Sequence, residues 1–586
     1  MTGSEGRYSG RRGGRIRVWP VLIAAWSLGM AGCSESDLTM GTYAPDSDGR
    51  STSDVRSRGD GLSDTTDVRR ADVAPPDYEL DDCLKLNGSA GASDCDVTVD
   101  PSKSVFVAPD GRDNNPGTKT APLRTLEAGL KKAAEATDKS TVLAQVGQYE
   151  KSVQLKEGVD LIGGYAADWS RAENQQTRIV AEGPAVKAGG ISKTTRLVDV
   201  EVRVAGEPSQ WKDVVTVYFK NSNGIELFDV RIIGADGGEG SEGLDGEDGA
   251  TGPAGGAGDD GGVSDDNRIC DLLQDSQGDS KGGSGGSSPC EGSDGGDGGN
   301  GGEGSNTGKR GEAGSKGGGR GGAPGQRTSD GSDGKDGDDG EPGDPGEGGE
   351  ADGRFDGLTW KGNKGERGGA GESGKGGGGG GGGGGGPPTP VDQCVPRVPQ
   401  VGTICTLAAE GPCTSPCGSQ FCCRVGCAHF GGGGGGGGAG GCGGKPGEGG
   451  RPGGATAALL LERSNVRIVG SYIEAGDGGD GGDGGEGGDG GDGGDGGSGG
   501  SGAGSSGAGP SGAGGAGGDG GKGGAGGAGG GGAGGPSFGI YSTDPLDPKP
   551  VKTTIQKGRG GEGGGSPAGS SDARGERGLA EKIHVE

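Results

Sequence analysis

The sequence predicts a mainly β fold, built from a repeated strand–turn–strand unit and interrupted by long glycine-rich insertions. Three observations lead to this prediction. Apolar residues occur in short β-like runs separated by Gly, Asn, Asp or Pro, and one segment alone has helical spacing. The strand–turn–strand pattern recurs, each time just before a glycine tract. Glycine and proline, 157 and 30 of the 586 residues, make up roughly a third of the chain, which is typical of low-complexity sequence.

The composition excludes several classes of protein. Hydrophobic residues amount to 27% and aromatic residues to 3%, too few to fill the cores of a large multidomain enzyme or a polytopic membrane protein. The formal net charge is −29, and because residues 104–233 are neutral, the acidity belongs to the low-complexity parts. Phosphate binding needs a basic surface, so we expect no nucleic-acid partner.

The N-terminal residues have the pattern of an export signal, predicted over residues 1–32. Several arginines precede an apolar run, Val18 to Met30, that is too short to span a bilayer comfortably. The ending Met30-Ala31-Gly32-Cys33 resembles a bacterial lipobox, although Met replaces the usual Leu. The resemblance implies lipidation of Cys33 and anchoring in the bacterial cell envelope, at the outer membrane or cell surface. An ordinary secretory signal that ends near a Cys is the alternative.

Two regions follow the signal. Residues 33–103 are rich in Ser, Asp, Thr and Gly without an apolar period, which predicts a disordered tether with a local disulfide between Cys83 and Cys95. Residues 104–235 have the composition of a compact domain. One helix is predicted over Leu126–Ala136, with Thr125 as its N-cap. The predicted strands are Val142–Val146, Val153–Leu155, Val159–Ile162, Arg196–Val204, Val214–Phe219 and Ile225–Ile233.

The order of motifs in this domain resembles the N-terminal module of pectin-lyase-like, right-handed parallel β-helix proteins. The motifs are Val105-Phe106-Val107-Ala108-Pro109-Asp110-Gly111, Asn115-Pro116-Gly117-Thr118, Ala121-Pro122-Leu123-Arg124-Thr125-Leu126, Gly147-Gln148-Tyr149 and Gly158-Val159-Asp160-Leu161-Ile162-Gly163-Gly164-Tyr165, ending at Trp169. The resemblance implies a small β-helix-like domain in which the helix caps the open end of a stack of coils. Such a cap prevents edge-to-edge aggregation.

The strand–turn–strand unit that ends this domain is repeated at 457–475 and, more weakly, at 538–556. Each copy is followed by a glycine tract, so we expect the tracts to be insertions at one turn of successive coils. The insertions are 236–456 and 476–537, and residues 538–586 hold the last coil and a glycine-rich tail. Isolated strands in a disordered tail are the alternative, which is disfavoured because a two-stranded unit alone is marginal in water.

The glycine tracts have a period of three residues. Between Asp477 and Asp495 the repeat is Gly-Gly-Asp, and three residues per turn suits a polyproline-II-type helix. Such helices, packed side by side, would form a polyglycine-II-like sandwich, and the composition resembles the repeat region of PGRS-type surface proteins. Solvated flexible loops are the alternative. A collagen triple helix is not expected, because the runs with glycine at every third position are short and acidic.

Twelve cysteines besides Cys33 predict disulfides, because an exported chain meets an oxidising compartment. Cys270 and Cys290 form a second local couple. The Cys-rich segment 394–442 holds eight cysteines whose pairing is not assignable, and His429 could join them as a zinc ligand. The disulfide candidates are Cys83, Cys95, Cys270, Cys290, Cys394, Cys405, Cys413, Cys417, Cys422, Cys423, Cys427 and Cys442.

The Gly-Gly-Asp repeat also offers calcium candidates. Carboxylates three residues apart on an extended helix stand roughly 9 Å apart, too far for one strand to chelate an ion that takes six to eight oxygens. Weak binding across several strands is the most that is expected, and no other cofactor is. The candidate ligands are Asp477, Asp480, Asp483, Asp489, Asp492 and Asp495.

Two carboxylates and an ion pair are the candidates for chemistry in the compact domain. Asp199 and Asp229 occupy equivalent places in two copies of the repeat and could be neighbours on adjacent coils, as the paired carboxylates of glycan-cleaving enzymes are. Glu201 and Arg231 form the next rung, which we expect to be a cross-strand ion pair. In the copy at 466–475 the corresponding position is Gly470, where the acidic rung stops. The glycine runs lack the strand, the helix and the lysine that a phosphate-binding loop needs, so they are not candidates for nucleotide binding.

These observations favour a non-enzymatic exported lipoprotein, displayed at the surface, with an adhesive or envelope-structural role. The alternative is a polysaccharide-binding or polysaccharide-cleaving β-helix protein, which the resemblance suggests but which fold alone does not establish. The expected partners are the membrane, through the lipid anchor, and extracellular polysaccharide or other cell-surface components.

Overall fold

The computed structural model describes residues 84–86, 97–172, 175–205, 213–262, 280–396, 416–417, 420–504, 511–546 and 549–586, all within one compact unit, Ala74–Glu586. The predicted signal 1–32 with Cys33, most of the tether and the Cys83–Cys95 couple lie outside the described residues. In the part of the chain that is described, one α-helix accompanies strands that pair mainly in parallel, as predicted.

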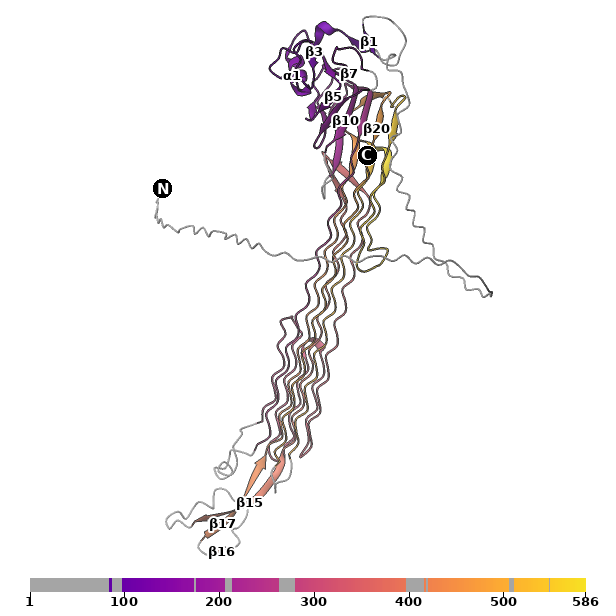
Figure 1. Ribbon diagram of the computed structural model, residues 1–586. Coiled ribbons are helices and arrows are strands. Elements are labelled where there is room, and N and C mark those ends of the chain that lie inside the picture. Colours follow the sequence, from indigo (N-terminus) through magenta and orange to yellow (C-terminus); the bar gives the residue numbers. More distant parts are fainter. Residues whose placement is uncertain are drawn as a thin grey trace, which may run out of the picture. The chain divides into compact units, whose positions relative to one another are not determined.

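The helix α1 (Leu126–Glu135) covers the first coil, as the sequence predicts. The Thr125 hydroxyl accepts a hydrogen bond from the backbone N–H of Ala128 at 3.2 Å, which satisfies one of the unpaired donors of the first turn. Leu130 is fully buried against the core, and α1 packs on β3 (Ser104–Val107) and β4 (Thr141–Gln145). The apolar end of the coil stack is therefore closed on this side (Figure 1).

Two parallel sheets carry the coils. The first has the order β22-β20-β12-β10-β7-β4-β3, with β5, β8 and β19 paired beside it, and the second has the order β23-β21-β18-β11-β9-β6. The further strands are β5 Gly147–Tyr149, β6 Val153–Gln154, β7 Asp160–Tyr165, β8 Thr177–Ala181, β9 Val186–Gly189, β10 Thr195–Val204, β11 Val214–Lys220, β12 Ile225–Ile233, β18 Thr456–Glu462, β19 Val466–Val469, β20 Tyr472–Glu474, β21 Ser537–Ser542, β22 Thr554–Gln556 and β23 Ala580–Val585.

Successive coils stack with side chains in register, which makes this a parallel β-helix-like fold. The inward residues of one rung, such as Leu197, Leu227 and Ile468, lie on one another in a fully buried core. All the predicted strands are present with small shifts of their ends. Among the strands of the coils, sequence analysis did not predict β5, β8, β9 and β23, whose apolar residues are few or are separated by polar residues and glycine.

The later repeats belong to the same stack, so the prediction that coils resume after each insertion is confirmed. β18 pairs with β11, β20 with β12, β21 with β18 and β22 with β20, all in parallel. The glycine tracts leave the stack after β12, β20 and β22 and return at β18, β21 and β23. They therefore emerge at one corner of successive coils, as the sequence predicts (Figure 1).

The predicted tether ends earlier than residue 103. β2 (Val97–Val99) pairs in parallel with β1 (Leu84–Leu86), and a 3-10 turn follows at Pro101–Lys103. Val97 and Val99 are 2% exposed and pack with an outward row of apolar side chains on the first sheet, which includes Phe106 and Phe228. The boundary at residue 103 is wrong because these two valines have an apolar surface to cover, which composition alone does not reveal.

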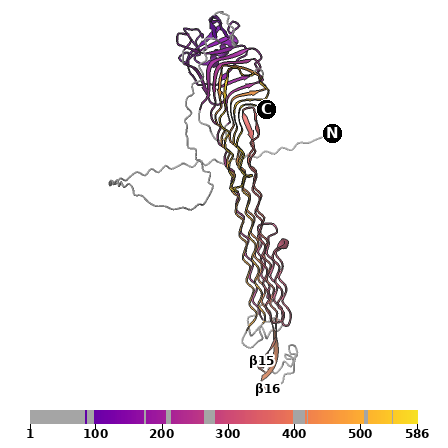
Figure 2. The same cartoon turned by 90° about the vertical axis from the view of Figure 1, so that its right-hand side faces the viewer.

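Outside the stack, the glycine tracts run side by side as extended strands without sheet pairing (Figures 1 and 2). We number those of the described chain in order. They are tract 1 (234–262), tract 2 (280–288), tract 3 (294–302), tract 4 (307–314), tract 5 (319–326), tract 6 (331–350), tract 7 (363–385), tract 8 (431–455), tract 9 (476–504), tract 10 (511–536), tract 11 (558–565) and tract 12 (574–579).

Backbone hydrogen bonds of period three join the tracts into one bundle. Along tract 1, the glycine at every third position, from Gly234 to Gly261, donates its N–H to a carbonyl of β20 or tract 9 at 2.7–2.9 Å. Each such glycine allows a close approach: a Cβ on Gly243 would lie 2.0 Å from the carbonyl oxygen of Glu448. This is a polyglycine-II-like arrangement, and the alternative of solvated flexible loops is wrong for these tracts.

The number of glycines in each triplet follows the number of neighbouring tracts. Tract 8 hydrogen-bonds to tracts 1, 2, 3, 7, 9 and 10 over residues 431–438, where every residue is glycine. Tract 7 is likewise all glycine over 376–385, where tracts 3, 4, 5, 6, 8 and 10 surround it. A tract at the edge of the bundle, such as tract 1, needs only one glycine per triplet over most of its length.

Two antiparallel hairpins interrupt the bundle. β13 (Gly353–Asp356) and β14 (Thr359–Gly362) connect tracts 6 and 7 next to the stack, and Trp360 packs on Phe538 and Tyr541 of β21. β15 (Gly386–Pro396), β16 (Pro416–Cys417) and β17 (Gln420–His429) follow tract 7 and precede tract 8 at the other end. The Cys-rich segment thus begins where the tracts are farthest from the coils (Figure 1).

Candidate functional site

The two candidate carboxylates lie at a bend that recurs in each coil. Asp199 and Asp229 have φ of 45° and 52°, the left-handed region that Asp and Asn tolerate better than other non-glycine residues. Each divides a long strand into two halves that pair with different neighbours. The same bend is occupied by Gly164 and Gly470, with φ of 74° and 62°. The backbone conformation at this corner therefore favours Asp or Gly.

Asp199 and Asp229 are neighbours on adjacent coils, as the sequence predicts. Val198 is paired with Phe228 and Val200 with Val230, so Asp199 and Asp229 face each other across one strand spacing, about 4.8 Å. Arg171 forms an ion pair with Asp199, and its other guanidinium nitrogen donates to the carbonyl of Gly163 at 2.5 Å.

The glycine at the preceding bend makes room for this ion pair. A Cβ on Gly164 would lie 1.8 Å from Oδ2 of Asp199, so glycine is required there. The Arg171 guanidinium also lies over the ring of Tyr165, 4.9 Å from its centroid. Sequence analysis missed Arg171, since it lies in a loop without a repeat partner, and spacing gave no signal for it.

The environments of the two carboxyls differ. Burial raises the pKa of Asp229 to about 7, and the neighbouring charge of Asp199 adds to the rise. Burial also raises the pKa of Asp199, but Arg171 opposes the rise by stabilising the charged form. At neutral pH Asp229 is therefore close to half-protonation, beside an Asp199 whose charged form is stabilised by Arg171. Such a pair can exchange a proton with a bound group.

The rung next to this pair is the predicted ion pair between Glu201 and Arg231, which is confirmed at 3.8 Å. The Glu201 side chain is 2% exposed and also meets Arg178 at 3.2 Å and Arg203 at 2.6 Å. The Arg231 guanidinium lies over the ring of Tyr472, at 5.2 Å from its centroid. Glu201 thereby contacts arginines of three successive coils, on β8, β10 and β12, and removing one of them would be costly because it would leave a buried charge less well paired.

The calcium candidates on tract 9 have a structural use. The carboxylates of Asp477, Asp480 and Asp483 accept hydrogen bonds from backbone N–H groups of tract 11, at 2.7, 2.7 and 2.5 Å. Other aspartates cap neighbouring tracts in the same way, for example Asp248 toward the N–H of Asp489 at 2.8 Å. Asp492 and Asp495 continue the row. No cluster of three or more potential metal ligands occurs among the described residues.

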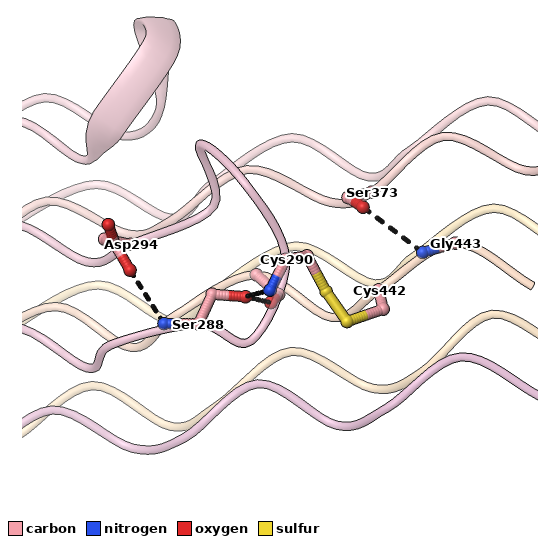
Figure 3. The surroundings of a disulfide bond; sticks show 7 residues. Ser288, Cys290, Asp294, Ser373, Cys442 and Gly443 are labelled. Atoms are coloured by element: carbon pink, nitrogen blue, oxygen red, sulfur yellow. Dashed lines mark hydrogen bonds between the residues drawn. A yellow bond between two sulfur atoms is a disulfide. The ribbon is translucent and has the colours of Figure 1, made fainter. Parts of the chain in front are cut away.

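One disulfide joins distant parts of the bundle. Cys290, in the turn between tracts 2 and 3, is bonded to Cys442 of tract 8, 152 residues away, so the predicted Cys270–Cys290 couple is wrong (Figure 3). Cys442 is the first residue larger than alanine after the all-glycine part of tract 8, at the point where tract 2 ends and tract 3 begins.

The other cysteine predictions lie outside the described side chains. They concern Cys270, Cys394, Cys405, Cys413, Cys417, Cys422, Cys423 and Cys427. His429, the candidate zinc ligand, is 4% exposed, and burial lowers its pKa.

Comparisons with known proteins find similarity of fold only. No protein family and no curated protein matches the sequence. Among solved structures, a rhamnogalacturonan lyase is 17% identical, with a TM-score of 0.17, over 24% of this chain and 41% of that one. A pectin methylesterase from carrot is 13% identical, with a TM-score of 0.17, over 23% and 43%. The chain spans less than half the length of both. The parallel β-helix-like fold is established by the strand pairings themselves.

Proposed function

We propose that this chain is a non-enzymatic, lipid-anchored protein of the bacterial cell envelope that displays its Cys-rich hairpin for adhesion. The observation that carries the proposal is the hydrogen-bonded bundle of glycine tracts between the coil stack and the hairpin β15–β17. Tract 1 alone, at about 3.1 Å per residue, extends roughly 90 Å. Such a bundle serves to hold one part of a protein at a fixed distance from another.

The chemistry of the bundle supports a display role over a catalytic one. Its buried atoms are mostly backbone. Its carboxylates cap neighbouring backbone N–H groups, form ion pairs such as that of Glu448 with Arg367, or are exposed. Residues 234–586 carry most of the negative charge, which keeps an extended surface soluble. Among the described residues no helix is long and apolar enough to cross a membrane. In this proposal the lipid on Cys33 anchors the chain.

Protease treatment of intact cells tests the location. We expect protease to shave the wild-type chain from the cells. We expect the Cys33→Ala variant to be released in soluble form, because it lacks the residue that would carry the lipid. A wild-type chain that is protected until the outer envelope is broken would refute surface display and favour a periplasmic structural role.

Deletion of residues 388–427 tests the role of the hairpin. The deletion retains Gly385 and Phe430, so tracts 7 and 8 keep their antiparallel arrangement. We expect the deleted chain to be exported and shaved like wild type, but cells that carry it to lose attachment to surfaces or to other cells. Undiminished attachment would place the adhesive surface elsewhere.

The second candidate function is cleavage of a polysaccharide at Asp199 and Asp229, which the shared bend and the raised pKa of Asp229 favour. The matched variants are Asp199→Asn and Asp229→Asn, which keep the shape and the tolerance for positive φ. Release of reducing ends from acidic and neutral polysaccharides by wild type, lost in both variants, would support cleavage. Equal, background release by all three proteins is the result expected from the display proposal.

A further inference from the structure

One face of the bundle is filled along only part of its length. Tract 11 lies between tracts 9 and 10, where it accepts hydrogen bonds from tract 9 and donates to tract 10. The tract 9 donors are the N–H groups of Gly478, Gly481 and Gly484, at 2.8–2.9 Å. In return, Gly561 and Gly564 donate to the carbonyls of Gly535 and Gly532, at 3.0 and 2.9 Å. Both walls of this strand site are thus backbone groups in a period of three.

Beyond the end of tract 11 the same two walls continue without a strand between them. Within the described chain, no hydrogen-bond partner is found for the next donors on tract 9 or for the corresponding acceptors on tract 10. These groups, which we call the open face, are the N–H groups of Gly487, Gly490 and Gly493 and the carbonyls of Gly520, Gly523 and Gly526. They repeat the spacing of the part that tract 11 occupies.

Both ends of the open face are closed by side chains. Ser566, just after tract 11, donates its hydroxyl to the carbonyl of Gly529 at 2.7 Å. At the other end the carboxylate of Asp519 accepts the N–H of Gly496 at 2.8 Å. The open stretch between Gly484 and Gly496 corresponds to about 37 Å of polyproline-II-type strand, or four triplets. The open face therefore has a defined length, which corresponds to one short strand.

The charges along the open face indicate which strand fits it. In the filled part, Arg559 of tract 11 forms an ion pair with Asp477 of tract 9 at 3.1 Å. Three further acidic residues, Asp489, Asp492 and Asp495, follow Asp477 in the same register and are exposed. Lys522 of tract 10 reaches across to Asp492, at 3.6 Å. A strand with a positive charge at every third residue would place a cation beside each of these carboxylates. The open face of a second copy of this chain carries the same carboxylates and would be repelled.

We propose that the open face binds one glycine-rich strand of another chain, in the polyproline-II conformation and with Arg or Lys at every third position. The strand extends the interface already made by tract 11. It accepts hydrogen bonds from tract 9, donates to tract 10 and places its cations beside Asp489 and Asp495. The proposal concerns the bundle itself and is independent of where in the cell the protein lies.

Two peptides of identical composition test the proposal with the full chain. In tract 11, a Cβ on Gly561 would lie 1.9 Å from the carbonyl of Gly479, whereas Gly560 faces tract 12, which is absent beside the open face. With Arg of each triplet at the position of Arg559, the peptide of four Arg-Ala-Gly triplets has glycine at the position of Gly561 and alanine at that of Gly560. The peptide of four Arg-Gly-Ala triplets has alanine at the position of Gly561, where there is no room for a Cβ. We expect the first peptide to bind at least about tenfold more tightly. Equal binding of the two peptides, or binding of neither, would overturn the proposal.

Variants locate the binding. Asp489→Asn combined with Asp495→Asn keeps acceptor oxygens but removes two charges, and we expect severalfold weaker binding that depends less on salt. Lys522→Ala frees Asp492 and should strengthen binding. The matched control is Asp344→Asn on the exposed side of tract 6, which should bind like wild type. Protection of the amides of Gly487, Gly490 and Gly493 from hydrogen exchange is expected with the first peptide, and its absence would place any binding elsewhere.

Discussion

The bend of the coil places two carboxyl groups side by side, and this arrangement opposes folding at neutral pH. Asp199 is compensated by Arg171, but Asp229 is held beside Asp199 in a largely buried position. What favours Asp there is the backbone, since φ of 52° is tolerated by Asp, Asn and Gly. Asparagine would keep the backbone preference without the charge.

The Asp229→Asn variant should therefore be more stable than wild type at high pH. The pKa of about 7 in the folded chain is above the usual 3.8, so the folded state binds the proton more tightly. Stability then falls as pH rises from about 4 to about 7, and the loss is complete above this window. We expect the variant to gain on the order of 4 kcal/mol at pH 8 and little at pH 4. Thermal unfolding at both pH values measures the difference.

The matched substitution at the neighbouring bend should give a smaller gain. Asp199→Asn leaves Arg171, whose side chain is 24% exposed, without its carboxylate partner. Burial raises the pKa of Asp199 as well, so its charge also costs stability at high pH, but the loss of the ion pair with Arg171 offsets the benefit of removing that charge. We therefore expect a smaller gain at pH 8 than in Asp229→Asn. A gain as large as that of Asp229→Asn would contradict the assignment of distinct environments to the two carboxyls.

A single methyl group in the bundle should matter only where another tract is close. A Cβ on Gly434 would lie 2.0 Å from the carbonyl of Gly380, whereas a Cβ on Gly565 would meet only the carboxylate of Asp483, at 3.3 Å. We expect Gly434→Ala to destabilise the bundle by about 3 kcal/mol or more and Gly565→Ala by less than about 1 kcal/mol. Hydrogen exchange of tracts 7 to 10 measures the effect. Equal losses would mean that the tracts do not pack at this spacing.

Residue-level prediction from the sequence succeeded where the repeat could be aligned. Asp199, Asp229 and Gly470 occupy equivalent places in the sequence and in the stack, because each coil repeats the same strand–bend–strand order. The same reasoning could not find Arg171 or the partner of Cys290. Both depend on contacts between segments that share no repeat, and Cys442 approaches Cys290 only because tracts 2, 3 and 8 fold together.

At the scale of elements, the Cys290–Cys442 disulfide fixes the turn between tracts 2 and 3 to tract 8 (Figure 3). Around it, the carboxylate of Asp294 accepts the N–H of Ser288 at 2.7 Å, which shapes the turn independently. We expect Cys442→Ser to cost about 2–4 kcal/mol in the stability of the distal bundle. Hydrogen exchange should accelerate in tracts 2 and 3 while the coil stack keeps its protection. Unchanged exchange in tracts 2 and 3 would contradict a structural role for the bond.

The glycine tracts show how far element prediction can go. Their period of three and polyglycine-II-like character were predicted, because period and composition are visible in one strand. The neighbours of each tract were not predicted, although the sequence holds a signal for them. Tracts with one glycine per triplet lie at the edge of the bundle, tracts with two lie at intermediate positions, and tracts with three lie inside. The all-glycine runs 376–385 and 431–438 are where tracts pack on every side, since no direction around the strand leaves room for a Cβ.

At the scale of the whole molecule, the bundle is assembled from segments that the coils hold apart in sequence. Tract 8 bonds to tract 1 on one side and to tracts 9 and 10 on the other, and β18 lies between β11 and β21 in the second sheet. The N-terminal coils, by contrast, have their own cap and a core from Val105 to Ile232. The two parts should therefore depend differently on the C-terminal third of the chain.

A chain that ends after Ala475 tests this dependence. It lacks tracts 9 to 12 and strands β21–β23, so the glycines of tracts 1 and 8 lose the backbone partners that now satisfy their polar groups. Unpaired backbone groups cannot stay buried, and glycine gains more conformational freedom on unfolding than any other residue. We expect residues 234–455 to become sensitive to protease and to lose hydrogen-exchange protection, while α1 and strands β3–β12 remain protected. A protected tract 8 in the shortened chain would mean that tracts 1 to 7 suffice to form the bundle, and an unprotected α1 would mean that the coils need the bundle to fold.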